Sequence, residues 1–189
     1  MRNLVASIEA EYARYKTLAE KAITQIDDAA LFRQGPGDAN SIPVIVRHIA
    51  GNLRSRFTDF LTSDGEKPWR DRDTEFEEPN WSRAELLDTW EAGWRVLFDA
   101  LRPLTDDDLS REVHVRGQAL KVHEALHRSL AHASYHAGQI VYLAKAARGD
   151  EWVSLSIPKG RSQDYNQQPS RERPADHAAE LDRRLRDRS

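Results

Sequence analysis

The chain has 189 residues, of which 31% are charged and 39% hydrophobic, a length and balance suited to one domain of amphipathic helices. Its formal net charge of −3 argues against a general affinity for nucleic acid, and the absence of cysteine excludes disulfides, thiolate nucleophiles and cysteine-ligated zinc. The first residues become charged too early for a signal peptide, and no apolar run approaches the roughly 18 residues that cross a bilayer, so we expect a cytoplasmic protein without membrane contact.

Two helices are expected in the first third of the chain. Apolar residues recur at steps of three and four over roughly residues 2–31 and predict the first helix. A stretch containing glycine and proline at 34–40 breaks this pattern. Ser41 can cap a second helix, and Pro43 suits its first turn, where a missing amide proton costs nothing. The apolar pattern of this second helix continues as far as the turn at 63–65, where we expect it to end.

A polar loop over residues 64–80 follows, and it is long for a connector inside a compact domain. Such loops are usually functional or mobile, and we expect Trp69 to anchor this one. Ser82 and Glu85 form the pattern of a capping box at the start of a third helix. That helix carries a strong apolar stripe and is expected to close at Pro103.

Shorter elements then lead to the longest helical pattern of the chain. Residues 105–109 indicate a helical turn, and 113–115 with 119–122 indicate a small hairpin or an extended loop. The periodicity that follows predicts a helix over about 122–148. Beyond it, we expect an extended segment with apolar anchors over 152–166.

Four long helical patterns around one core predict an all-α four-helix bundle, with long crossover loops, over residues 1–168. Residues 169–189 are rich in charge and poor in large apolar side chains. They predict a C-terminal tail that forms a frayed helix or stays disordered. His177 lies in this tail and is expected to be solvated.

His132 and His136 stand four residues apart in the last long helix. This spacing puts both imidazoles on one helical face, one turn apart, near enough to share a metal ion. His48 lies in the second helix, within a separate apolar segment. If the two helices pack together, three neutral nitrogens converge on one divalent cation and leave a coordination position open, as catalytic sites do.

Other interpretations of these histidines remain open. His123 and His127 repeat the same spacing, so spacing alone does not choose between the pairs. At about 100° per residue the two pairs fall on roughly opposite sides of the helix, and His136 is the nearest of the four to the apolar face. A His-x-x-x-His pair is equally typical of two edge histidines, and His48 alone is more typical of a satisfied buried histidine.

Asn52 and Arg56 follow His48 by one and two helical turns and are candidate substrate-binding residues on the same face. Arg56 suits a carboxylate on a substrate, or else a surface ion pair. Gln139, three residues after His136, is a candidate to orient that ring. No Asp or Glu stands out in the sequence as a general base.

Four stretches of the chain, taken together, resemble the DinB-like superfamily of metal-binding four-helix bundles, in its branch of small bacterial proteins. They are residues 48–69, Trp90-Glu-Ala-Gly-Trp94, residues 132–145 and residues 154–160. The likeness runs from about residue 5 to 166, and each stretch is specific only in combination with the others.

The resemblance implies a divalent metal, often nickel or zinc, held by His48, His132 and His136, and a homodimer. Relatives in the superfamily include thiol-dependent enzymes, such as bacillithiol transferase and mycothiol-dependent maleylpyruvate isomerase. Three neutral ligands leave the full charge on the ion, which favours an anionic fourth ligand such as hydroxide or thiolate. A protein without cysteine would then act as the platform for a low-molecular-weight thiol.

The leading hypothesis is therefore a divalent-metal-dependent enzyme, a thiol-cofactor-dependent transferase acting on a small electrophile. One alternative is a metal-dependent hydrolase. Another is a non-catalytic stress-response or ligand-binding bundle, which the lack of a visible acid or base favours. DNA binding through an arginine-rich segment is the least favoured, because the net charge is negative.

Overall fold

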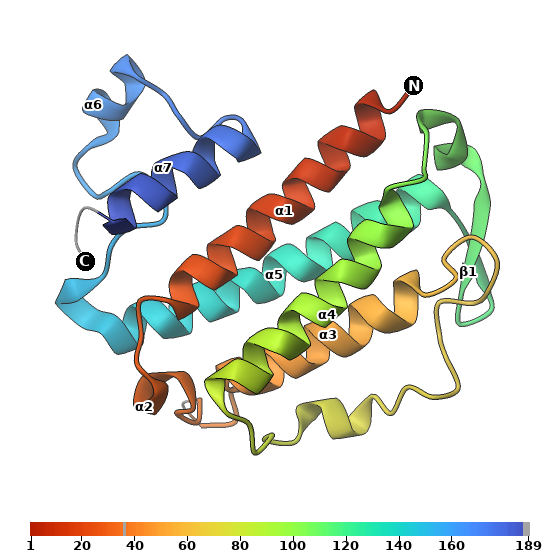
Figure 1. Cartoon of the computed structure of the whole chain (residues 1–189), viewed down its shortest axis with the longest axis horizontal. Coiled ribbons are helices and arrows are strands. Elements are labelled where there is room, and N and C mark those ends of the chain that lie inside the picture. Colours follow the sequence, from red (N-terminus) through yellow and green to blue (C-terminus); the bar gives the residue numbers. More distant parts are fainter. Residues whose placement is uncertain (36, 187–189) are drawn as a thin grey trace.

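Four long helices run beside one another along most of the molecule (Figure 1). The computed structural model describes residues 1–35 and 37–186, and most of them are helical. Helix α1 packs against α5 and helix α3 against α4, and further contacts join α3 to α5 and α1 to α4. The bounds of the four are Asn3–Ile23 for α1, Ile42–Phe57 for α3, Arg83–Leu101 for α4 and Val122–Arg148 for α5.

Shorter elements connect and extend these helices. Strands β1 and β2 form an antiparallel hairpin in which Val113 pairs with Leu120, the first of the two predicted alternatives. Within the described residues, no helix has the length and apolar character needed to cross a membrane. The bounds are Asp28–Leu31 (α2), Asp73–Phe76 (3₁₀ helix η1), Asp106–Ser110 (3₁₀ helix η2), Glu112–Val115 (β1), Gln118–Lys121 (β2), Gly149–Glu151 (3₁₀ helix η3), Ser162–Gln167 (α6) and Pro174–Arg186 (α7).

Two buried tryptophans of α4 pack in the core beside α1. Trp90 and Trp94 are each 1% exposed, and the edge of the Trp94 ring contacts Tyr12 of α1 at 6.3 Å between centroids. The buried Tyr12 hydroxyl donates to the carbonyl of Leu126 on α5 at 2.8 Å, so its polar end is satisfied inside the core. One aromatic cluster thereby joins three of the four long helices.

Helices α3 and α4 approach one another especially closely at Gly93. A Cβ atom at this position would lie 2.6 Å from the Cα atom of Ala50, so only glycine allows the two backbones to meet here. Ala50 lies two residues beyond His48 on α3. The close contact therefore fixes the part of α3 that carries the first candidate ligand.

The predicted starts of two helices are confirmed. The Ser41 side chain accepts a hydrogen bond from the amide of Val44, with a proline in the first turn of α3. At the start of α4, Ser82 and Glu85 form the reciprocal capping box. Each cap satisfies amide protons that a helix N-terminus otherwise leaves without a partner.

Several predicted boundaries are wrong. The first helix ends at Ile23, and Asp27 caps the separate short helix α2, so no continuous helix reaches residue 31. The second helix ends at Phe57, because Thr58 is extended and Asp59 adopts a φ of 50°. The segment expected to be extended after α5 turns helical from Ser162.

Trp69 does not anchor the loop over residues 64–80. Its side chain is 53% exposed and lies under the guanidinium of Arg54. The buried side chains of this loop are instead charged, namely Lys67 and Glu75, the latter in η1. The loop is therefore held by charged side chains and not by the aromatic one.

Within the C-terminal segment, Pro174–Arg186 form a helix, which is one of the two predicted alternatives. Helix α7 packs on α1, and its Leu181 and His177 are 1% and 6% exposed. The prediction that His177 is solvated is therefore wrong. Residues 187–189 of the predicted tail, and Pro36 in the break after the first helix, lie outside the described residues, and the division of the chain at residue 168 stays a prediction.

Candidate functional site

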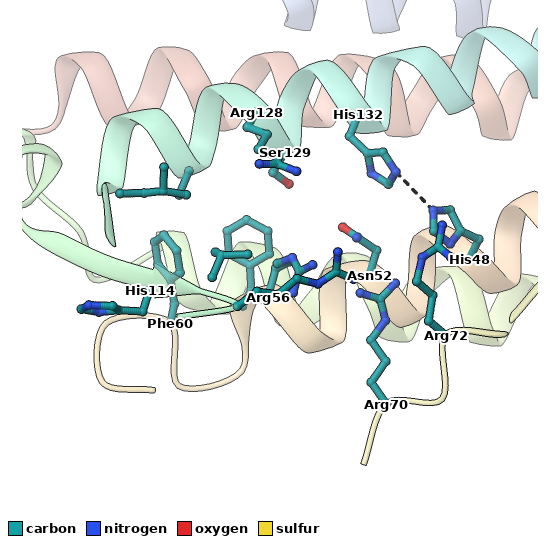
Figure 2. A pocket seen from close by; sticks show the side chains of 15 residues that line it. His48, Asn52, Arg56, Phe60, Arg70, Arg72, His114, Arg128, Ser129 and His132 are labelled. Atoms are coloured by element: carbon teal, nitrogen blue, oxygen red, sulfur yellow. Dashed lines mark hydrogen bonds between the residues drawn. The ribbon is translucent and has the colours of Figure 1, made fainter. Parts of the chain in front are cut away.

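Three histidines from two helices converge at the centre of the site, as predicted. The Nε2 atoms of His48 on α3 and His132 on α5 lie 3.2 Å apart (Figure 2). The ring of His136 is centred 5.0 Å from that of His48 and 4.6 Å from that of His132. Nitrogens bound to one tetrahedral zinc ion at about 2.0–2.1 Å lie roughly 3.3–3.4 Å apart. The three side chains are therefore close enough to bind one metal ion.

The packing of α3 on α5 resolves the choice between the two histidine pairs. One ligating atom from each of His48, His132 and His136 lies within 4.8 Å of the others, and no other such group of three occurs in the parts of the chain that the structure describes. The rings of His123 and His127 are 6.0 Å apart and lack a third partner of this kind there.

A buried carboxylate fixes the orientation of His48. Glu75 Oε2 lies 2.9 Å from His48 Nδ1, and Arg70 donates two hydrogen bonds of 2.8 Å to the same carboxylate. Burial alone would raise the pKa of Glu75, but the bonds from Arg70 and His48 hold this pKa below its usual range. An ionised carboxylate only accepts hydrogen bonds, so Nδ1 of His48 carries the proton and its Nε2 lone pair faces the other two histidines.

An amide performs the same task for His136. Nδ1 of this ring lies 2.7 Å from the side-chain oxygen of Gln139, one turn further along α5, which confirms the contact expected from their spacing. Because an amide oxygen accepts, Nδ1 donates, and Nε2 is again left with its lone pair. Two of the three rings are thus held in the tautomer that a metal requires.

The rings of His132 and His136 are neutral near pH 7. Burial, with the nearby His136 and His48, lowers the pKa of His132 to about 4. Burial and then the neighbouring His48 also lower the pKa of His136, against the opposing effect of its bond with Gln139. Only neutral imidazole binds a metal, so protons compete weakly with a cation at this site.

A cavity of about 210 Å³ opens beside His48 and His132, between α3, α5 and the hairpin (Figure 2). Both candidate substrate-binding residues, Asn52 and Arg56, line it. Arg56 also donates to the carbonyl of Gly65 and forms an ion pair of 3.0 Å with Glu66, which confirms the ion-pair interpretation, whereas substrate binding by Asn52 and Arg56 stays a prediction. The full lining is His48, Asn52, Arg56, Phe57, Phe60, Arg70, Arg72, His114, Val115, Arg116, Leu120, Ala125, Arg128, Ser129 and His132.

Glu75 and Arg70 were missed by sequence reasoning. They lie in the polar loop, and Glu75 is 27 residues from His48 along the chain, so no helical spacing links them. The feature of the sequence that pointed towards them is the length of the loop, because long loops are often functional. The glycine at position 51 is a second feature, because a Cβ atom there would lie 2.2 Å from Glu75 Oε1.

A family model described as "Protein of unknown function (DUF1572)" matches residues 1–161. The matched region includes the three histidines, Glu75 and the cavity, and it ends before α6. No curated protein and no solved structure shows a match to the chain.

Proposed function

The chain belongs to the DUF1572 family, and for this member we propose a divalent-metal-dependent enzyme that transfers a low-molecular-weight thiol to a small electrophile. The observation that carries the proposal is the convergence of three imidazoles beside a cavity. We further propose that α1, α3, α4 and α5 form a four-helix bundle of the DinB-like type. One histidine on the second long helix and two on the last support that assignment.

The donor set suits nickel or zinc, because imidazole is a preferred ligand of both ions. Glu75 and Gln139 contact His48 and His136 at Nδ1, so these two partners leave the Nε2 atoms of both rings available. His48 and His132 line the cavity. A divalent cation bound here would supply positive charge that stabilises an anionic nucleophile.

The side chains of the cavity favour thiol transfer over hydrolysis. No Asp or Glu is among the residues that line it, and the nearby Glu75 is already bound by Arg70 and His48. Of the two nucleophiles, a free thiol loses its proton more readily than free water does, so a cavity without a general base suits a thiol better. In the transfer, a sulfur–carbon bond forms, the leaving group departs with its electron pair, and the thiol proton goes to solvent.

The non-catalytic alternative requires a protein group that closes the site. Glu75 was the best candidate for such a group, since it is the buried acid of the 64–80 loop. Its contact with Nδ1 of His48 instead of Nε2 favours the enzyme. The homodimer expected from the resemblance stays a prediction.

The test is conjugate formation by the metal-loaded chain. Protein loaded with nickel or zinc is incubated with a panel of cellular thiols and small electrophiles, and the thioether product is detected by mass spectrometry. We expect a product whose formation is lost in His132→Ala and kept in His127→Ala, which removes an exposed histidine from the same helix. A folded, fully loaded protein that forms no conjugate with any pair, or a His132→Ala variant as active as the parent, would contradict the proposal.

A further inference from the structure

The cavity beside the histidines is rich in positive charge, and nearby carboxylates neutralise only part of it. Five of its lining residues are arginines and none is acidic. Arg70 is paired with Glu75, and Arg56 and Arg116 share Glu66 at 3.0 and 2.9 Å. The other two arginines of the lining are Arg72 and Arg128.

Neither Arg72 nor Arg128 has a carboxylate partner within residues 1–35 and 37–186. Both are exposed, and the guanidinium of Arg72 lies over the ring of Phe76 at 4.8 Å. Unpaired guanidinium groups at the entrance of a small cavity attract an anion and can bind its carboxylate through two parallel hydrogen bonds. Among the arginines that line the cavity, Arg72 and Arg128 are therefore without a carboxylate partner, whereas Arg56 already forms an ion pair with Glu66.

The wall of the cavity also carries apolar side chains and a serine. Phe57, Phe60, Val115 and Leu120 line it, together with Ser129 of α5. Ser129 is 9% exposed, and the only partner of its hydroxyl among the described residues is the neighbouring hydroxyl of Tyr12, which itself donates to Leu126. A serine hydroxyl can rotate, so Ser129 can turn to donate to a polar atom of a ligand in the cavity that it lines. Figure 2 shows Arg128 and Ser129 together on the α5 wall, opposite Arg56 and Phe60.

The size of the cavity limits the ligand. An engineered cavity of about 150 Å³ in another protein holds benzene, and the cavity here has about 210 Å³. There is room for a six-membered ring or a short alkyl chain with one small polar group. A large nucleotide or peptide does not fit.

We propose that this cavity binds a small organic carboxylate with a compact apolar body, about the size of benzoate. The carboxylate pairs with Arg128 near Ser129, and the body packs against Phe57 and Phe60. This inference rests on the proposed function in one respect, namely that the carboxylate belongs to the electrophilic substrate. Binding itself needs no metal, because the residues invoked are not the histidines.

The experiment titrates the full metal-free chain with benzoate and follows binding by NMR. The same titration is repeated with three other compounds. Benzyl alcohol keeps the ring but lacks the charge, benzylamine carries the opposite charge on the same ring, and inorganic phosphate is an anion without the ring. We expect saturable binding of benzoate, at least fivefold tighter than that of benzyl alcohol or phosphate, and no binding of benzylamine, since charge-assisted bonds are roughly twice as strong as neutral ones. Equal binding of benzoate and benzyl alcohol, or of benzoate and phosphate, would overturn the proposal.

Variants of α5 locate the interaction. Arg128→Gln should weaken benzoate binding about fivefold, and Arg128→Lys should weaken it less because it keeps the charge but loses the planar fork. Lys145→Gln is the matched control, since it removes one charge from the same helix outside the cavity. A loss in Lys145→Gln equal to that in Arg128→Gln would show a general charge effect and contradict the site.

The variant His136→Ala separates this proposal from the metal hypothesis. His136 does not line the cavity, so we expect benzoate affinity within about twofold of the parent in this variant, whether or not metal binding is lost. Failure of benzoate to bind a chain that holds its metal would overturn the substrate class alone. Benzoate binding by a chain that never takes up metal would leave the cavity intact and remove the proposed metal chemistry.

Discussion

Glu75 lies between a guanidinium and an imidazole, and all three side chains are nearly inaccessible, at 2% exposure for Arg70, 7% for Glu75 and 5% for His48. Charges buried in this way are stable only when every partner is in place. The carboxylate therefore couples the loop over residues 64–80 to helix α3. Its orientation of His48 is the type of outer contact that usually tunes metal affinity.

Replacing Glu75 by Gln should weaken metal binding about 10–100-fold, the usual cost of losing such an outer partner. The amide keeps the shape of the side chain but loses the charge that holds the proton on Nδ1 of His48. Titration against a chromophoric chelator measures the affinity. Glu77→Gln, at an exposed position of the same loop, should leave the affinity unchanged, and equal affinities in Glu75→Gln and the parent would refute the role of Glu75.

Gly51→Ala should disturb the same contact through sterics. The new Cβ would lie 2.2 Å from Glu75 Oε1, so the carboxylate must shift, and we expect a loss of about 1–3 kcal/mol in the free energy of unfolding together with weaker metal binding. Gly138→Ala on α5 meets open space and should raise the free energy of unfolding by about 0.4–1 kcal/mol. Urea denaturation compares the two variants, and equal stability of Gly51→Ala and the parent would contradict the contact.

At the residue scale, the sequence predicts what depends on helical spacing. His132, His136 and Gln139 share one helix, and their contacts follow from its geometry. Glu75 and Arg70 reach His48 only because a loop folds over α3, and loop geometry has no period to detect. For Trp69 the sequence predicted a contact that the structure lacks. An aromatic side chain in a polar loop suggested an anchor, but this side chain lies exposed.

At the scale of elements, helix α7 depends on one neutral histidine. Nε2 of His177 lies 2.9 Å from the carbonyl oxygen of Leu155, and Nδ1 lies 3.4 Å from a nitrogen of Arg14. A carbonyl accepts and a guanidinium donates, so the ring fits both partners only with its single proton on Nε2. Burial lowers the pKa of His177, and nearby Arg14, Arg171 and Arg184 lower it further, against the bond to Leu155.

The packing of α7 on α1 should therefore weaken in acid. Because the folded pKa of His177 is depressed, its contribution is fully present above the ordinary imidazole pKa of about 6.5 and is lost as the pH falls below that value. Hydrogen exchange of residues 174–186, corrected for intrinsic rates, should show less protection at pH 5.5 than at pH 7.5.

His177→Gln supplies the test of this interpretation. A Gln side chain can still donate to Leu155 but does not titrate, so the difference between the two pH values should shrink, whereas His127→Gln, at an exposed position, should keep it. Equal protection of α7 at both pH values in the parent chain would disprove the role of His177.

Periodicity finds helices better than it finds their ends. Ile26 continues the apolar pattern of the first helix and is buried, although α1 has already ended at Ile23 and a turn has begun. Phe60 is likewise buried beyond the end of α3 at Phe57. An apolar side chain reaches the core from a turn as well as from a helix, so burial patterns overrun the hydrogen-bonded element. Caps such as Ser82 with Glu85 mark a boundary directly and were predicted correctly.

At the scale of the whole molecule, the site exists because α3 and α5 pack together. The two helices are separated by the loop, α4 and the hairpin along the chain, and the tryptophan cluster with the close contact at Gly93 holds them in place. A sequence shows that three histidines are available but not that they face one another. Likewise, the negative net charge of the chain gives no indication that a cavity is lined by arginines.

The central claim is that His48, His132 and His136 bind one divalent cation, and a calorimetric titration of the metal-free chain with zinc or nickel tests it most directly. We predict one ion per chain for the parent and for His127→Ala, and loss of this site in a folded His132→Ala variant. A folded parent chain that takes up no ion, or a His132→Ala variant that binds it with unchanged affinity, would contradict the claim.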